Sequence, residues 1–213
     1  KTVEIKRGNT VSVDGSNALT YGEKVSKLTL GNTVFVETGT DDMIEGILSW
    51  SNPDEIPAAG TTQAGWLFKP ADSTHYAELT GTAAITVAKA TPVIAEKPTA
   101  GALTYGQKLS DSTLTGGKAA YQTADGTEIT GTFAWKNSSS RPTAADSQKT
   151  EYDVIFTPSD KDNYNAVDTK LTITVNNASQ APNMPQAEMA PAHSTKKVGD
   201  ITLPDGWNWH EAD

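Results

Sequence analysis

The most constraining feature of this 213-residue sequence is that its two halves match each other at a nearly constant spacing. ALTYGEKVSKLTL (18–30) matches ALTYGQKLSDSTL (102–114) at an offset of 84, and GILSW (46–50) matches GTFAW (131–135) at 85. FKPADSTHY (68–76) matches FTPSDKDNY (156–164) at an offset of 88. Internal similarity at a fixed period indicates that one structural unit is used more than once. The sequence therefore predicts two tandem repeats, over residues 9–89 and 90–176.

Each copy has the pattern of short β-strands joined by turns. Apolar residues alternate with other residues in ILSW, TFAW and LTITV, which is the period of a half-buried strand. The Asp125-Gly126 pair between two such stretches predicts a hairpin, and no stretch has a helical period. We predict an all-β fold made of two tandem immunoglobulin-like β-sandwich repeats.

Each repeat is expected to have its own hydrophobic core. The alternating apolar positions place Val25, Leu30, Ile44, Leu48, Trp50, Trp66, Phe68, Ile85 and Val87 in the first core. The same argument places Leu109, Leu114, Ile129, Phe133, Trp135, Val154, Phe156, Leu171, Ile173 and Val175 in the second.

The string F-x-P-x-D-x-x-x-Y follows a predicted strand in both copies. Proline ends the ladder because it has no N–H donor, and aspartate favours turns by bonding its own backbone. A tyrosine that packs on the core edge, with its hydroxyl holding the turn, resembles the tyrosine corner of immunoglobulin-like sandwiches. We interpret these positions as structural corners, formed by Phe68, Pro70, Asp72 and Tyr76 in the first copy and by Phe156, Pro158, Asp160 and Tyr164 in the second.

The alternative reading of the second corner is a calcium loop built from Asp160, Asp162 and Asn163. Calcium takes six to eight oxygen ligands, usually including several carboxylates. The first copy has Thr74 and His75 where the second has Asp162 and Asn163, so it lacks the second carboxylate. This difference favours the structural interpretation.

The flanking residues are expected to belong to further repeats. KTVEIKRGNTV (1–11) resembles AAITVAKATPV (83–93), so residues 1–8 are predicted to be the tail strand of a preceding repeat. Residues 177–196 are a linker rich in proline, alanine and glutamine. Residues 197–213 are predicted to be a truncated third repeat, in which Trp207 and Trp209 take the places of Phe133 and Trp135. These two tryptophans are expected to pack against a neighbouring copy, and the alternative is an aromatic platform for a glycan.

The sequence offers no candidate catalytic residue. Without cysteine there is no disulfide, thiolate metal site or cysteine nucleophile. The three histidines have no companion at metal-ligand or triad spacing, and neither a G-x-S-x-G elbow nor a phosphate-binding loop is present. We therefore predict a protein that is not an enzyme and has no cofactor and no bound metal.

Charge narrows the choice of partners. The net charge of −9 disfavours binding to nucleic acid or to an anionic membrane, and no apolar run reaches the roughly 18 residues of a membrane span. Glu37, Asp41, Asp42 and Glu45 form an acidic cluster in the first copy. A solvated turn is the simpler interpretation, and the alternative is a partner-binding patch that contains Asp41, Asp42 and Glu45.

The strings L-T-Y-G, F-x-P-x-D-x-x-x-Y and the closing I-T-V resemble the MBG-like or bacterial immunoglobulin-like repeats of Gram-positive, Clostridia-type cell-surface proteins. The resemblance lies in framework positions and carries over no binding residue. It implies an extracellular segment at the bacterial cell surface or cell wall that serves as a structural spacer or stalk and contributes to adhesion. Its partners would be neighbouring repeats of the same chain. The alternative is an adhesin-type module that recognises a glycan or a host protein through its loops.

Overall fold

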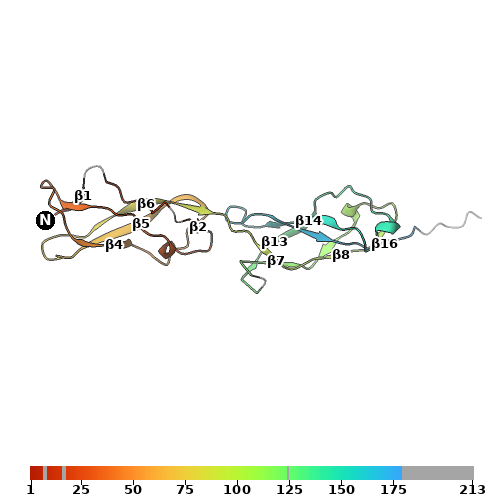
Figure 1. Cartoon of the computed structure of the whole chain (residues 1–213). Helices are drawn as coiled ribbons and strands as arrows, with labels where there is room; N and C mark the ends of the chain where they lie inside the picture. Colours follow the sequence, from red (N-terminus) through yellow and green to blue (C-terminus); the bar gives the residue numbers. More distant parts are fainter. Residues whose placement is uncertain (7–8, 16–17, 124, 179–213) are drawn as a thin grey trace, which may run out of the picture. The chain divides into compact units, whose positions relative to one another are not determined.

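The computed structural model describes residues 1–178 apart from 7–8, 16–17 and 124 (Figure 1). These residues form strands, turns and short 3-10 helices, which confirms the all-β prediction. We call residues 1–89 the N-terminal segment and residues 90–176 the C-terminal segment. Both belong to one unit, Lys1–Asn176.

The N-terminal segment is built around a four-stranded sheet. Its elements are β1 (Val3–Ile5), β2 (Leu19–Thr20), η1 (Val25–Lys27), β3 (Phe35–Glu37), β4 (Gly46–Trp50), β5 (Gly60–Pro70) and β6 (Leu79–Ala88). The sheet has the order β2-β6-β5-β4, and β1 pairs separately with β3. All pairs are antiparallel except β2 with β6, where Leu19 lies opposite Val87. Alternate residues of β5 (Ala64, Trp66 and Phe68) are buried, as the period of two requires.

The first residues of the chain belong to the N-terminal segment. We expected residues 1–8 to be the tail strand of a preceding repeat. Instead, Val3 pairs with Glu37 and Ile5 pairs with Phe35. Val3 is buried in the same core as Trp66, and Ile5 packs against that core. Residues 3–5 therefore complete the N-terminal segment, because their alternating apolar side chains cover its core.

The C-terminal segment has more and shorter strands. They are β7 (Val93–Glu96), β8 (Thr99–Ala100), β9 (Leu103–Thr104), β10 (Leu114–Thr115), β11 (Lys118–Ala120), β12 (Glu128–Ile129), β13 (Gly131–Trp135), β14 (Tyr152–Pro158), β15 (Val167–Leu171) and β16 (Val175–Asn176). The 3-10 helices are η2 (Leu109–Asp111) and η3 (Ala144–Asp146). The sheets are β13-β14-β15 and β12-β11-β7, with the pairs β10-β8 and β16-β9. The pairing of β11 with β12 confirms the hairpin that Asp125-Gly126 predicts.

A buried tryptophan occupies the same place in both segments. The Trp50 indole Nε1 donates a hydrogen bond to the backbone oxygen of Leu28 (2.9 Å), and Trp135 Nε1 donates to the backbone oxygen of Ser112 (3.3 Å). A buried carbonyl that loses its partner costs about 1–3 kcal/mol. Each tryptophan therefore fixes the chain after a 3-10 turn to its sheet.

Other features recur at the same offsets. In the C-terminal segment Val175 pairs in parallel with Leu103, as Val87 does with Leu19. The predicted linker beyond residue 178 and the predicted third repeat, with Trp207 and Trp209, lie outside the described residues.

Candidate functional site

The two corner loops share one backbone geometry. The backbone N–H of Tyr76 donates to the oxygen of Asp72, and that of Tyr164 donates to the oxygen of Asp160, both at 3.1 Å. Each loop follows a buried proline at the end of a strand, Pro70 of β5 or Pro158 of β14. This geometry is that of a turn which reverses the chain between two paired strands.

The carboxylate of Asp72 organises the first loop. Its Oδ1 accepts hydrogen bonds from the Thr74 hydroxyl (2.7 Å) and from the backbone N–H groups of Thr74 and His75 (3.1 and 3.2 Å). Its Oδ2 lies 2.7 Å from His75 Nδ1. The hydrogen bonds from Thr74 and His75 lower the pKa of Asp72 to about 2. The Tyr76 hydroxyl makes its hydrogen bond outside this turn, donating to Glu37 Oε2 of β3 (2.9 Å).

The second loop uses its aspartate differently. Asp160 Oδ1 accepts from the backbone N–H of Asn163 (3.1 Å), and Asp160 Oδ2 accepts from Asn163 Nδ2 (2.9 Å). The carboxylate thus holds both the backbone N–H and the side-chain amide of Asn163. Asp162 is exposed and takes no part in these bonds. Asp160 and Asn163 are hydrogen-bonded to each other, and the described residues contain no group of three or more acidic, histidine or cysteine side chains placed to hold a metal.

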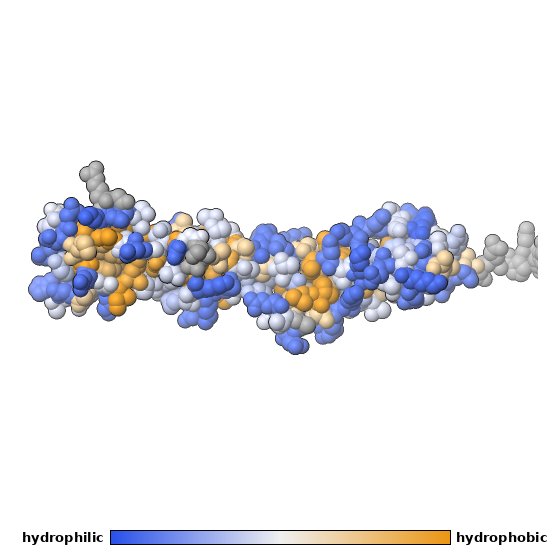
Figure 2. Space-filling model, viewed as in Figure 1, coloured by the Kyte–Doolittle hydropathy of each residue, from blue (hydrophilic) through white to orange (hydrophobic). Residues whose placement is uncertain are grey.

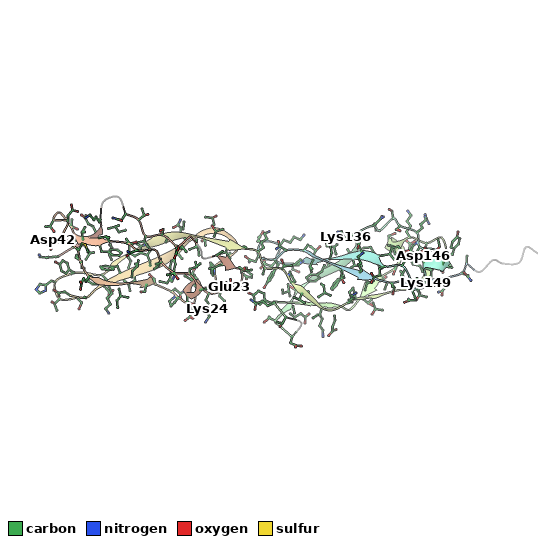
Figure 3. The ribbon with its side chains drawn as sticks, in the orientation of Figure 1. Glu23, Lys24, Asp42, Lys136, Asp146 and Lys149 are labelled. Atoms are coloured by element: carbon green, nitrogen blue, oxygen red, sulfur yellow. The ribbon has the colours of Figure 1, made fainter. Side chains whose placement is uncertain are left out.

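The acidic cluster is divided by its hydrogen bonds. Glu37 accepts from Lys1 Nζ (2.9 Å) and from Tyr76, and these two bonds lower the pKa of the Glu37 carboxyl. Asp41 and Asp42 lie on the exposed turn between β3 and β4, where Asp41 has a positive φ of 62°. Asp42 is labelled in Figure 3. Glu45 is exposed just before β4. Asp41, Asp42 and Glu45 thus form an exposed acidic rim, apart from the paired Glu37.

An open groove of about 870 Å³ lies beside this rim in the N-terminal segment. Its lining includes Leu30, Phe35, Ile44, Leu48 and Phe68, together with Glu45. Met43 and Ile47 also line it and are 72% and 70% exposed. Figure 2 shows apolar side chains gathered on this segment. Large apolar side chains with such exposure beside a concave surface are typical of binding sites.

The C-terminal segment has a smaller groove in the same place. It measures about 390 Å³ and is lined by Leu114, Ile129, Phe133 and Phe156, with Lys118 and Glu128. At the offset of 85, Glu128 and Thr132 replace Met43 and Ile47. Of these two grooves, only the first is therefore lined by an exposed apolar pair, Met43 and Ile47. Comparison of GILSW with GTFAW shows in the sequence that Thr132 replaces Ile47. Alternation along one strand does not tell whether another sheet covers a given side chain, so it does not predict that Ile47 is exposed.

No family model matches the chain, and no curated protein is similar to it. Within the described residues, no helix has the length and apolar character to cross a membrane.

Proposed function

We propose that residues 1–176 are two tandem copies of one immunoglobulin-like β-sandwich, and that they form a non-enzymatic spacer in an extracellular bacterial surface protein. The recurrence of the framework at offsets of 84–88 carries the proposal. The tryptophan-to-carbonyl bond, the parallel pair between an early and a late strand, and the corner turn each occur once in either segment. Repetition of a framework, with different residues at exposed positions, supports a role in length and spacing.

A display experiment tests the spacer role. Residues 1–178 are placed between a cell-wall anchor and a peptide tag on a Gram-positive cell, and binding of a large antibody to the tag is measured. Deleting residues 90–176 is expected to reduce antibody access, because the tag then lies closer to the wall. Replacing Asp41 and Asp42 by asparagine should leave access unchanged. Equal access with one or two segments would overturn the spacer role.

The second candidate is an adhesin-type module that uses the groove of the N-terminal segment. The observation that favours it is the exposure of Met43 and Ile47 beside an acidic rim. A panel of mucin glycans, plant polysaccharides and extracellular-matrix proteins would be screened with residues 1–178. Met43→Glu combined with Ile47→Thr replaces these residues by those at the corresponding positions of the C-terminal segment. The double substitution is expected to abolish saturable binding. Binding that survives the double substitution would exclude the groove as its site.

A further inference from the structure

The corner loop of the C-terminal segment contacts residues far from it in the sequence. Ala90 is buried and lies against this loop: its N–H donates to the Asn163 oxygen (2.9 Å), and its oxygen accepts from the N–H of Asn165 (2.8 Å). The side chain of Asn165 also donates to Thr91 Oγ1 (3.0 Å), and Lys89 Nζ donates to the Lys161 oxygen (2.6 Å). The chain that joins the two segments is therefore fastened to the loop on both sides of Ala90.

The same backbone pattern occurs at the first corner. The Lys1 backbone nitrogen donates to the His75 oxygen (2.6 Å), and the Lys1 oxygen accepts from the N–H of Ala77 (3.3 Å). His75 and Ala77 are the counterparts of Asn163 and Asn165 at the offset of 88. Fastening of an incoming strand is therefore a property of both corners, and it does not by itself join two segments.

What distinguishes the second corner is its side-chain contact with the N-terminal segment. Asn163 Oδ1 accepts a hydrogen bond from the backbone N–H of Ala59 (2.8 Å). The hydrogen bond from Asn163 Nδ2 to Asp160 Oδ2 holds the side-chain amide in the orientation that presents this oxygen. Asp160 is thus a positioning residue for Asn163. This role differs from the one that the calcium hypothesis gave to its carboxylate.

Three tyrosines add a second point of contact. The Tyr121 hydroxyl donates to the backbone oxygen of Tyr21 (2.9 Å), and the ring of Tyr164 packs edge-on against the Tyr21 ring with centroids 5.2 Å apart. Aromatic rings in this arrangement attract each other beyond the area they bury. Burial raises the pKa of the Tyr164 hydroxyl, as expected for a ring enclosed by these contacts.

The L-T-Y-G motif of the C-terminal segment provides a comparison. Gly22 and Gly106 both have positive φ angles, 95° and 92°. A Cβ on Gly22 would collide with the Tyr121 hydroxyl, whereas one on Gly106 would meet no atom within 4 Å. Tyr105, the counterpart of Tyr21, is 58% exposed. One motif is thus covered by the other segment, and its copy is open among the described residues.

We infer that Tyr121, Asn163 and Tyr164 form a clamp on Tyr21, Gly22 and Ala59 that fixes the orientation of the two segments. Domains joined by a short linker move relative to one another unless an interface restrains them. The clamp consists of two hydrogen bonds to backbone groups and one aromatic pair, in addition to the contacts of Lys89, Ala90 and Thr91 at the junction. The inference rests on these contacts and not on the spacer proposal, because a clamp of this kind would serve an adhesin equally well.

Distance measurement between two spin labels tests the clamp. The chain has no cysteine, so Thr82→Cys on β6 and Ala134→Cys on β13, both exposed, accept one nitroxide label each. Double electron–electron resonance on residues 1–213 is expected to give one narrow distance distribution. Asn163→Ala combined with Tyr121→Phe removes the clamp's hydrogen bonds to Ala59 and Tyr21 and should widen the distribution about twofold.

The controls come from the open copy of each motif. His75→Ala and Tyr105→Phe change the counterparts of Asn163 and Tyr21 and should leave the distribution unchanged. Amide hydrogen exchange verifies that each labelled variant remains folded. A distribution that is broad before any substitution, or one that the clamp variant does not widen, would overturn the inference. Neither result depends on whether the segments act as a spacer, which the display experiment tests separately.

Discussion

The two segments fill one cross-strand position with different pairs of residues. Trp66 of β5 lies opposite Gly81 of β6, while at the corresponding position Val154 of β14 lies opposite Thr169 of β15. A Cβ on Gly81 would collide with the Trp66 ring, so the large side chain of Trp66 requires a glycine opposite it. In the C-terminal segment both residues are of intermediate size. The comparison indicates that the framework depends on the volume of the pair more than on either residue.

Burying Trp66 in the core of the N-terminal segment has a cost in stability. Trp66 Nε1 is buried and has no hydrogen-bond partner among the described residues. A buried donor without a partner costs about 1–3 kcal/mol. The apolar area of the indole, which packs at a tilt against the Phe35 ring with centroids 6.1 Å apart, offsets this cost. Val154 brings no polar group into the core of the C-terminal segment and incurs no such cost.

Exchanging the pair between segments is expected to have the largest effect. Gly81→Thr should destabilise the N-terminal segment by about 3 kcal/mol through overpacking, and Trp66→Val by about 3 kcal/mol through the cavity it leaves. The double variant should recover about 1–3 kcal/mol relative to the sum, because each change relieves the other. Urea denaturation, with hydrogen exchange to assign the effect to one segment, measures this coupling. Strict additivity would refute the paired-volume interpretation.

The two tryptophan-to-carbonyl bonds sharpen the comparison further. Trp50→Phe removes a bond of 2.9 Å and Trp135→Phe removes one of 3.3 Å, so each variant leaves a backbone oxygen unpaired. We expect a loss of about 1–2 kcal/mol in each case, larger for Trp50, because the shorter bond is the stronger. Urea midpoints of the two variants provide the measurement. A larger loss for Trp135→Phe would show that packing of the ring outweighs the bond.

Sequence patterns predicted most of the buried core. Val25, Trp50, Phe68, Val154 and Ile173 were expected inside from their alternation and are buried. By contrast, Leu30, Ile44 and Leu48 were expected in the core and are only partly buried, because they line the groove. Alternation tells which residues share a face of a strand. It does not tell how completely another sheet covers that face.

Long-range pairing was harder to predict. The sequence of residues 1–8 resembles a closing strand, and its own pattern cannot tell which segment supplies its partner; only the pairing with β3 does. Likewise the L-T-Y-G motif occurs twice, and nothing local distinguishes the covered Tyr21 from the exposed Tyr105. The corners were predicted from turn chemistry, but the contact of Asn163 with Ala59 spans 104 residues. Such contacts depend on how the folded sheets of the two segments pack together, which local sequence does not specify.

The two glycines of the L-T-Y-G motifs allow a finer test. Gly22→Ala and Gly106→Ala both place a Cβ in the left-handed region and should each lose about 1 kcal/mol of stability. Gly22→Ala alone should also widen the spin-label distance distribution, because its Cβ collides with the Tyr121 hydroxyl. Urea denaturation and the resonance measurement would be made on the same proteins. If Gly106→Ala widened the distribution as much, backbone strain and not the Tyr121 contact would explain the effect.

The smallest expected effect concerns the first corner at low pH. The Asp72 carboxylate is exposed, and hydrogen bonds from Thr74 and His75 lower its pKa to about 2, below the value of about 3.9 for an unfolded aspartate. A lowered folded-state pKa means that the stabilisation is complete above about pH 4 and is lost as the pH falls toward 2. Asp72→Asn should therefore make the N-terminal segment slightly less stable at pH 7 and should flatten its stability between pH 4 and pH 2. Thermal melts across this range, with carboxyl NMR titration of Asp72, measure both. An unchanged pH profile in Asp72→Asn would assign the acid sensitivity to other carboxylates, such as Glu37, whose pKa is also lowered by its hydrogen bonds with Lys1 and Tyr76.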